Sequence, residues 1–240
     1  MANEMIYIHE HIDITLQNRA KYIDHMTRGW GMSIGPERPM LCFGVWATVG
    51  STERWPEATN MWELPGWDGM AENFRIEFNN PKHQDPNLET WWSGAAAYRS
   101  GGYDRLLIPA LYSPTLKELI ARGVKGEVYY HETIRVAPGQ ARAYLELFER
   151  HWLPVAERIG LQLVGAYRTA MLNDSEVIVL WAMKDWDTWA DVEMAYETDE
   201  GVASWRARTR DLAIDWRNKL LSPAPLHPLT TGRQPGVKEM

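Results

Sequence analysis

The stretch MIYIHEHIDITLQNRAKYIDHMTRGW, residues 5–30, recurs in altered form as EVYYHETIRVAPGQARAYLELFERHW, residues 127–152. The two stretches align without a gap at a constant offset of 122 residues. Identical residues recur along their length, namely Tyr7 with Tyr129, His9 with His131, Glu10 with Glu132, Tyr22 with Tyr144, Arg28 with Arg150 and Trp30 with Trp152. Self-similarity at a long, fixed spacing indicates a duplicated structural unit, so we expect two copies of one fold.

The similarity continues outward from these stretches with small changes of offset, as loops of different length would cause. The matched segments are Gly44–Trp46 with Gly165–Tyr167, Trp62 with Trp181, Trp67-Asp68 with Trp186-Asp187, Trp91 with Trp205, and Leu106–Ala110 with Leu220–Ala224. We therefore predict a first repeat over residues 1–114, a linker with a short helix over 115–126, a second repeat over 127–228 and a flexible tail over 229–240.

The second repeat indicates the order of its elements most clearly. Runs of β-branched, aromatic and aliphatic residues predict strands over residues 128–136, 161–171, 176–183 and 219–222. Apolar residues at three- and four-residue spacing after Pro138-Gly139 predict a first helix. Asp185 or Asp187 can cap a short second helix, and a longer one from Thr198 would bury Val202, Trp205, Leu212 and Trp216.

This β-α-β-β-α-β order is that of the ferredoxin-like unit, a four-stranded antiparallel sheet with helices on one face. The bare face of each sheet needs cover, and two copies provide it by packing sheet on sheet. The predicted fold class is therefore α+β, with two tandem ferredoxin-like repeats stacked sheet to sheet as a pseudo-twofold α/β barrel.

The composition excludes several classes of protein. With 45% hydrophobic and 24% charged residues, the chain is not of the disordered type. Its single cysteine, Cys42, excludes an internal disulfide framework and a multi-thiolate metal site. The net charge of −7 argues against nucleic acid as a partner. Because no long apolar run and no leader-like N-terminus is present, we expect a cytoplasmic protein without a membrane partner, either monomer or homodimer.

The second repeat carries a recognisable series of short motifs. These are Tyr129, Pro138-Gly139, Phe148-Glu149-Arg150, Val164–Thr169, Leu180-Trp181 and Leu220–Pro223, in this order. The series resembles the NIPSNAP family of the dimeric α/β-barrel superfamily, over essentially all of the second repeat and more weakly over the first. The resemblance implies the ferredoxin-like barrel fold. It implies no single activity, since the superfamily includes cofactor-free monooxygenases, polyketide cyclases, lactone isomerases, hydroxynitrile lyases and haem enzymes.

Glu10 and Glu132 are the first candidates for chemistry. Strand alternation places each of them on the otherwise apolar face that should lie under the helices. Where the NIPSNAP family often has Glu-Leu-Arg, this chain has Ile8-His9-Glu10 and Tyr130-His131-Glu132, with acid in place of base. A carboxyl group buried there would have a raised pKa suited to general acid–base work. The structural alternative is an ion pair of each glutamate with Arg28 or Arg150 of its own repeat.

Histidines form the second candidate group. His9 and His11 share one strand face, and together with His131 they could supply three imidazoles to a metal. Hydrogen-bonded histidines are the more common outcome, and an acid–base role for His9, His11 or His131 suits their titration range better than metal binding does. Because Thr133 stands where the first repeat has His11, the differences between the copies favour the first repeat as the active one.

Aromatic residues at matched strand positions would form the walls of a binding pocket or plain core. The chain has 13 tryptophans and only 4 phenylalanines, and most of the tryptophans are matched between the repeats. The candidate substrate-binding residues are Tyr7, Trp46, Trp62, Tyr129, Tyr130, Tyr167, Arg168 and Trp181, with Arg168 able to orient a carboxylate or enolate.

These features favour an enzyme that needs no cofactor and acts on a small hydrophobic or aromatic metabolite. It would remove a proton next to a carbonyl group and lead to cyclisation, isomerisation or elimination, the chemistry of a lyase or isomerase. One alternative is a haem enzyme of the same superfamily, with His25, His151 or a histidine of the 79–87 loop as the axial ligand. Another is a non-catalytic NIPSNAP-like stress or interaction protein. No P-loop, dinucleotide-binding or serine-hydrolase motif is present.

Overall fold

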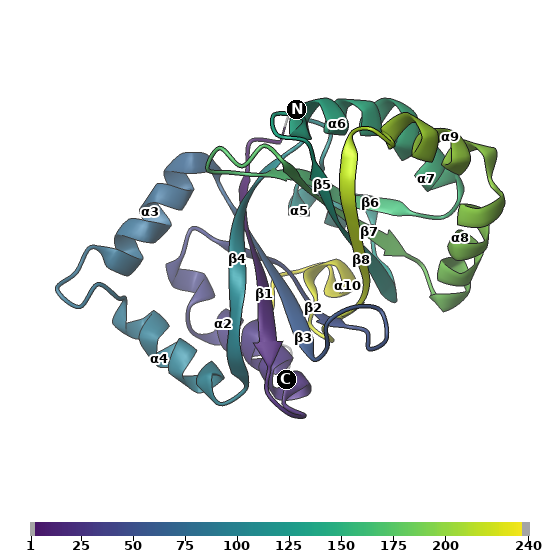
Figure 1. Ribbon diagram of the computed structural model, residues 1–240. Coiled ribbons are helices and arrows are strands. Elements are labelled where there is room, and N and C mark those ends of the chain that lie inside the picture. Colours follow the sequence, from purple (N-terminus) through teal and green to yellow (C-terminus); the bar gives the residue numbers. More distant parts are fainter. Residues whose placement is uncertain (1–2, 237–240) are drawn as a thin grey trace. The chain divides into compact units, whose positions relative to one another are not determined.

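A computed structural model describes residues 3–236 of the chain (Figure 1). It divides into two compact units. The repeat-one unit consists of Glu4–Leu106 and the segment from Pro223 onward, and the repeat-two unit consists of Leu107–Ser222 together with Asn3. Each unit contains one copy of the β-α-β-β-α-β order predicted from the sequence.

The repeat-one unit contains four strands and the helices that join them. In chain order these are β1 (Ile6–Ile14), α1 (Arg19–Asp24), a π-helical turn (His25–Gly29), α2 (Trp30–Met32), a 3₁₀ turn (Gly35–Glu37), β2 (Leu41–Thr48), β3 (Glu57–Leu64), α3 (Gly66–Phe78), α4 (Pro86–Ala96) and β4 (Arg99–Pro109). Its strand order is β4-β1-β3-β2, and the pairs of β3 with β1 and with β2 are antiparallel. After β8, α10 (Pro228–Thr231) returns to this unit.

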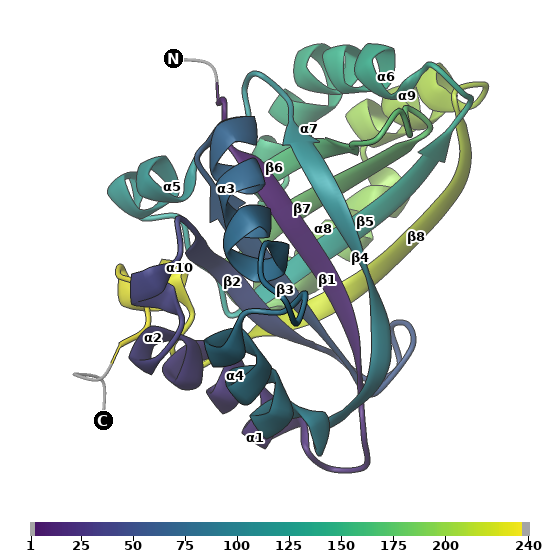
Figure 2. The ribbon, with the colours of Figure 1, turned by 90° about the vertical axis from the view of Figure 1, so that its left-hand side faces the viewer.

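The linker helix α5 (Leu116–Arg122) leads into the second repeat and ends at Gly123, whose left-handed conformation closes it. The second repeat contains β5 (Val128–Val136), α6 (Ala141–Leu147), a π-helical turn (Phe148–Trp152), α7 (Leu153–Arg158), β6 (Gln162–Thr169), β7 (Glu176–Met183), α8 (Trp186–Thr198), α9 (Glu200–Thr209) and β8 (Ala213–Pro223). The strand order is β8-β5-β7-β6. The helices of this repeat lie on one face of that sheet in both ribbon views (Figures 1 and 2).

The predicted fold class, α+β with two tandem ferredoxin-like repeats, is confirmed. Two predicted strands of the second repeat, residues 128–136 and 176–183, have the bounds that the sequence indicated. Asp185 caps α8, as expected, because its side chain accepts a hydrogen bond from the backbone N–H of Thr188.

The last strand of the second repeat differs from the prediction. The sequence placed Trp216 on a helix and began the strand at residue 219, whereas β8 begins at Ala213 and contains Trp216. The preceding helix α9 ends at Thr209. This difference matters because a strand directs the Trp216 side chain into the sheet face that carries Glu132.

The repeat boundaries differ from the predicted ones at 114 and 228. Leu107–Pro109, the end of β4, pairs with β6 inside the repeat-two unit. Ala224, just after β8, donates its backbone N–H to the carbonyl of Val45 at 2.9 Å inside the repeat-one unit. The last residues of β4 therefore belong to the repeat-two unit, and the residues from Pro223 onward belong to the repeat-one unit.

The predicted flexible tail, 229–240, is ordered in its described part. Gln234 forms two hydrogen bonds to the backbone of Cys42, at 2.8 and 2.9 Å. His227, which the sequence suggested as a surface residue, is fully buried, and its ring packs 4.6 Å from that of Trp46. Residues 237–240 of the predicted tail lie outside the described residues.

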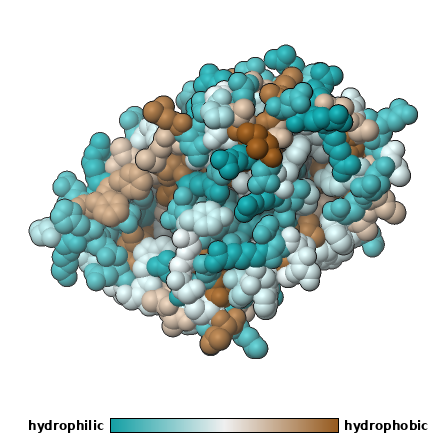
Figure 3. Space-filling view, in the orientation of Figure 1, coloured by the Kyte–Doolittle hydropathy of each residue, from teal (hydrophilic) through white to brown (hydrophobic). Residues whose placement is uncertain are grey.

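The face of the molecule shown in Figure 3 is mainly hydrophilic, with apolar atoms gathered over α3. That helix exposes Phe74, Ile76 and Phe78. Among residues 3–236, no helix combines the length and the apolar character that crossing a membrane requires.

Candidate functional site

Glu132 lies in the middle of β5, on the sheet face that packs against the helices of the second repeat. Its neighbours on that face of the strand are Tyr130 and Ile134, and across the ladders it is opposite Val179 of β7 and Asn218 of β8. Alternation along a strand places every second side chain on the same face, which is how the sequence predicted this position. The Glu132 side chain is buried, with a residue exposure of 4%.

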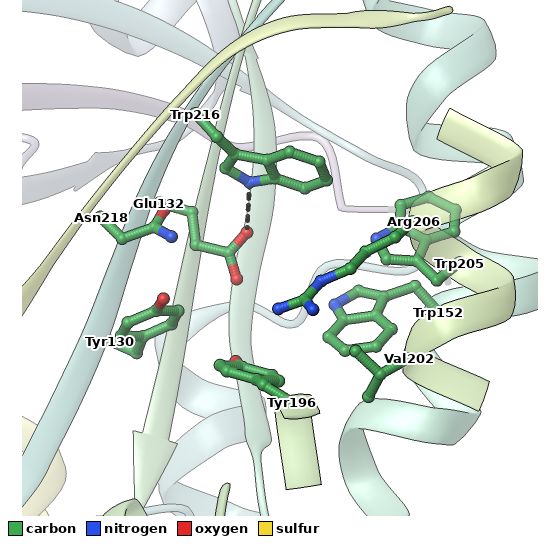
Figure 4. A pocket seen from close by; sticks show the side chains of 9 residues that line it. All are labelled: Tyr130, Glu132, Trp152, Tyr196, Val202, Trp205, Arg206, Trp216 and Asn218. Atoms are coloured by element: carbon green, nitrogen blue, oxygen red, sulfur yellow. Dashed lines mark hydrogen bonds between the residues drawn. The ribbon is translucent and has the colours of Figure 1, made fainter. Parts of the chain in front are cut away.

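Two indole groups hold the carboxyl group of Glu132. Trp181 donates its Nε1–H to Oε1 at 2.8 Å. Trp216 donates its Nε1–H to Oε2 at 3.3 Å, the bond drawn in Figure 4. The register of the sheet explains the arrangement, since Trp181 is opposite Tyr130 and Trp216 is opposite Ile134, on either side of Glu132. Indole N–H groups are donors only, so they favour the ionised carboxylate.

Burial raises the pKa of Glu132 to about 7, and the hydrogen bonds from Trp181 and Trp216 partly oppose that rise. Desolvation disfavours the charged form of a carboxyl group, while donors pointed at its oxygens favour that form. A carboxyl group that titrates near neutral pH can both accept and return a proton under physiological conditions.

A cavity of about 380 Å³ opens beside this carboxyl group. Its lining comes from β5, the π-helical turn, α8, α9 and β8, and consists of Tyr130, Glu132, Trp152, Tyr196, Val202, Trp205, Arg206, Trp216 and Asn218 (Figure 4). Five of these nine residues are aromatic, and Glu132 is the only carboxylic acid among them. A concave, mainly aromatic space with a few polar groups is the usual form of a small-molecule site.

Glu10 occupies the equivalent position in the repeat-one unit, where the indole of Trp62 hydrogen-bonds it as Trp181 does Glu132, and Asn60 is an additional polar partner. Asn60 donates its side-chain N–H to Glu10 Oε2 at 2.8 Å and also to the hydroxyl oxygen of Tyr22 at 2.8 Å. Burial raises the pKa of Glu10 to about 7 and the negative charge of Asp104 adds to that rise, while the hydrogen bonds from Trp62 and Asn60 and the positive charge of Arg99 oppose it. The buried, proton-accepting glutamate predicted from the sequence is thus present in both units.

The alternative reading of these glutamates as ion pairs with arginine is wrong. Arg28 pairs with Asp24 at 3.1 Å, and Arg150 lies 3.8 Å from Glu146. Both pairs are formed within one helical segment between residues four apart, which is the ordinary surface arrangement. Neither arginine reaches the glutamate of its repeat.

His9 and His11 lie on the opposite face of β1 from Glu10. Their rings form an edge-to-face pair with 4.6 Å between centroids. His11 Nδ1 is 3.3 Å from Glu57 Oε1, and both residues are buried. His131 likewise lies on the opposite face of β5 from Glu132, in the repeat-two unit. The histidines are thus separated from the carboxyl groups by the sheet, and their acid–base and metal-binding roles stay predictions.

The predicted aromatic residues fall into two sets. Tyr130 and Trp181 contribute to the surroundings of Glu132. The others have places in the packed interior: Tyr7 donates to Glu63 at 2.8 Å, Trp46 packs on His227, Trp62 packs on Trp30, and Tyr129 and Tyr167 are buried. Arg168 is half-buried in β6, opposite Val177.

Seven of the nine cavity residues were not predicted as site residues from the sequence, namely Trp152, Tyr196, Val202, Trp205, Arg206, Trp216 and Asn218. The repeat alignment contains a signal for Arg206, which follows the matched Trp205 and stands where the first repeat has Trp92. Likewise, the match of Leu220 to Leu106 places Asn218 at the position of Asp104 and Trp216 at that of Gly102.

The histidines proposed as haem ligands have ordinary surroundings. His25 Nε2 is 2.8 Å from the carbonyl oxygen of Trp91, and its ring stacks on that of Trp91 at 5.2 Å. His151 and His83 are exposed. The haem alternative stays a prediction.

The NIPSNAP family model matches residues 130–228. The second repeat is a NIPSNAP domain. The match contains every residue that lines the cavity, so the candidate site belongs to the NIPSNAP part of the chain. No curated protein has a sequence significantly similar to this chain.

Solved structures with this fold cover the whole chain or one repeat. A proposed monooxygenase from Lactobacillus acidophilus NCFM is 10% identical, with a TM-score of 0.62 over 92% of this chain and 95% of its own. An anthrone oxidase-like protein is 11% identical, with a TM-score of 0.61 and 93% of each chain covered. A NIPSNAP family protein from Agrobacterium tumefaciens is 26% identical over 43% of this chain and 94% of its own, with a TM-score of 0.40. The two longer matches cover both NIPSNAP-like repeats, which confirms the tandem fold and establishes no shared activity.

Proposed function

We propose that the chain is an oxidoreductase that acts on a small aromatic compound with an acidic C–H or O–H group, and that Glu132 takes up the proton. The observation that carries this proposal is the buried carboxyl group, with a pKa of about 7, at the wall of an aromatic cavity. The family resemblance alone does not select this chemistry, since one fold serves many reactions.

The class of reaction is suggested by the structures that share the fold. Two of those that match over the full length are described as a proposed monooxygenase and an anthrone oxidase-like protein. The comparisons give no support to the cyclisation, isomerisation or elimination predicted from the sequence. We therefore replace the lyase or isomerase prediction by oxidation that begins with the same proton transfer.

Anthrone illustrates how the proposed reaction balances. Glu132, as carboxylate, removes a proton from the methylene group, and the resulting carbanion is delocalised into the ring and its carbonyl group. Addition of dioxygen to that carbon and return of the proton from Glu132 give a hydroperoxide. Loss of water from the hydroperoxide forms the second carbonyl, so that anthrone and dioxygen yield anthraquinone and water.

The chain's own residues have defined tasks in this scheme. Trp181 and Trp216 hold the two carboxylate oxygens and keep the base aligned. The aromatic rings of Trp152, Trp205 and Tyr196 offer faces on which a flat substrate can stack and from which it displaces water. A base positioned in this way typically accelerates proton transfer by about 10²- to 10⁴-fold.

The test compares two single substitutions with anthrone as the probe. We expect Glu132→Gln to lower the rate of dioxygen uptake and quinone formation by about 100-fold or more, because the amide cannot take up the proton. Glu10→Gln, the matched change in the other repeat, should leave most of the rate intact. Circular dichroism and a thermal melt would confirm that both variants are folded.

Three outcomes would contradict the proposal. Full activity of Glu132→Gln would exclude this carboxyl group as the base. Loss of activity only in Glu10→Gln would place the reaction in the first repeat, as the sequence had suggested. If the unmodified protein consumed no dioxygen with anthrone or with hydroxylated anthrones, the proposed oxidation would be wrong.

A further inference from the structure

The cavity in the second repeat contains one cationic side chain, that of Arg206. Arg206 belongs to α9 and is exposed at the rim, and its guanidinium group points across the cavity toward Glu132 (Figure 4). Within residues 3–236 this guanidinium group forms no hydrogen bond or ion pair. It therefore presents its full set of donors to whatever enters the cavity.

Among the described residues, neither Glu132 nor Glu193 forms an ion pair with Arg206. Glu132 accepts hydrogen bonds from the two indoles described above. Glu193 of α8, the other acidic residue near this end of the cavity, accepts a hydrogen bond from Trp189 Nε1 at 3.0 Å. Burial raises the pKa of the Tyr196 hydroxyl, and the positive charge of Arg206 opposes that rise, which indicates that this charge acts across the cavity.

A second polar atom in the cavity wall also lacks a partner. Asn218 lies opposite Glu132 in the β5–β8 ladder, and its Oδ1 is buried without a hydrogen bond. The Asn218 side chain also hydrogen-bonds Tyr130, so it belongs to the fixed wall of the cavity. The cavity thus offers a cation at its rim, facing the proposed base.

The first repeat has different residues at both positions, and its nearby cation, Arg99, comes from β4 and not from a helix. Trp92 stands at the position of Arg206, and the guanidinium group of Arg99 lies 3.9 Å above its ring. Asp104, a carboxylic acid, stands at the position of Asn218.

We propose that Arg206 binds an anionic group of the substrate, a carboxylate or phenolate, while the ring system stacks on the cavity's indoles with its reacting hydrogen toward Glu132. This inference rests on the proposed function, because it assigns the substrate class of the same cavity. Arginine suits the role, since its planar fork pairs with a carboxylate through two parallel hydrogen bonds and also stacks on aromatic rings. The substrate class is then an aromatic acid or an ionised phenol.

The test uses binding rather than turnover, with 2-naphthoate and its neutral counterpart 2-naphthamide as probes in isothermal titration calorimetry. We expect the unmodified protein to bind naphthoate about tenfold or more tightly than naphthamide, as charge-assisted hydrogen bonds predict. Arg206→Gln should abolish this preference. Arg208→Gln, a change of the same kind on the same helix outside the cavity, should retain it.

The outcomes separate this inference from the proposed function. Equal binding of the two probes, no binding of either probe, or an unchanged preference in Arg206→Gln would overturn the assignment of Arg206. Glu132→Gln should still prefer naphthoate, because the anion site does not depend on the base. If Glu132→Gln kept full oxidase activity while Arg206→Gln lost the preference, the proposed function would fail and the anion site would stand.

Discussion

Glu10 and Glu132 show how two equivalent residues acquire different capacities from their neighbours. Both are buried, and burial raises the pKa of each to about 7. The first repeat surrounds its glutamate with polar side chains, since Asn60 bridges Glu10 to Tyr22. In the second repeat Val179 stands in place of Asn60, the Trp216 indole is added to the one tryptophan that each glutamate has, and a cavity lies beside the carboxyl group. Chemistry on a bound molecule needs that access as well as the raised pKa.

Removing one indole donor should raise the pKa of Glu132 further. Trp181→Phe and Trp216→Phe each keep an aromatic ring and remove an N–H group that stabilises the carboxylate. A hydrogen bond to a charged group contributes about 1.5–3 kcal/mol, which corresponds to a rise of roughly one to two pKa units. The rate should increase with pH as Glu132 ionises, and we expect the midpoint of that increase to shift to higher pH in both variants. The shift should be larger for Trp181→Phe, because Trp181 forms the shorter hydrogen bond.

Measurement of kcat/KM from pH 5 to 9 checks this prediction. Tyr130, Tyr144 and Tyr196 also face this carboxyl group, and the charges of Glu193 and Arg206 act on Tyr130 and Tyr196. The control is Trp189→Phe, which removes an indole N–H that is bonded to Glu193 and not to Glu132. The control should leave the midpoint near its original pH. A downward shift in either of the two variants would contradict the assigned role of the indoles.

At the scale of elements, the strand predictions were accurate where both faces of the sheet follow a clear pattern. β5 and β7 are continuous and largely buried, so their residue types define them. The first half of β8 is mainly exposed, and Ile214 on it faces solvent. Its apolar residues therefore show no alternation, and the spacing from Trp205 to Leu212 and Trp216 resembles one face of a helix.

The cavity could be predicted only in part, because local sequence patterns do not show how strands pair or how helices pack on the sheet. Glu132 and Tyr130 lie on one strand, so alternation alone placed them on one face. Trp216 and Asn218 reach Glu132 through the β5–β8 register, which is set by tertiary pairing and not by any local pattern. Arg206 and Tyr196 come from two different helices, and their convergence depends on how those helices pack on the sheet.

The start of α9 should control the shape of the cavity, because this helix carries Val202, Trp205 and Arg206. Asp199 caps the helix through the backbone N–H groups of Gly201 and Val202, and it also pairs with both terminal nitrogens of Arg158. We expect Asp199→Ala to lower Tm and to weaken naphthoate binding, since the first turn loses its cap.

Arg158→Gln is the matched control, because it removes the exposed ion pair and keeps the cap. Exposed ion pairs contribute little to stability. The control should therefore show a smaller loss of Tm and unchanged naphthoate affinity. Equal effects of the two variants would mean that the ion pair, and not the cap, positions α9.

At the scale of the whole molecule, the sequence repeat and the compact units do not coincide. The repeat predicted boundaries at residues 114 and 228, whereas the chain changes units at residues 106–107 and 222–223. Periodicity locates copies of a pattern, but strand pairing at the ends of β4 and β8 decides where each segment packs. Folding of either unit therefore requires segments that are distant in the sequence, a feature that slows folding.

Buried titratable groups in both units set the pH dependence of stability for the molecule as a whole. Glu10 and Glu132 have a pKa of about 7 in the folded protein against 4.5 in the unfolded chain, so folding takes up protons between these values and stability falls as pH rises through this window. Burial lowers the pKa of His227 from 6.5 to about 3, so stability falls as pH decreases through that range.

These opposing terms predict the highest Tm near pH 4.5. Above about pH 4.5 the two glutamates lower the free energy of unfolding with rising pH by more than the histidine raises it. Below that pH the histidine has the larger effect of these three groups. Each glutamate contributes up to about 3 kcal/mol of lost stability between pH 4.5 and 8, given 1.36 kcal/mol per pKa unit. Thermal melts from pH 3 to 9 should show the maximum, and Glu10→Gln/Glu132→Gln should flatten its alkaline side. His227→Gln, which lacks the titrating ring, should instead flatten the acid side. A maximum at pH 8 in the unmodified protein, or an alkaline side unchanged in the double variant, would mean that the two carboxyl groups are not desolvated as the structure indicates.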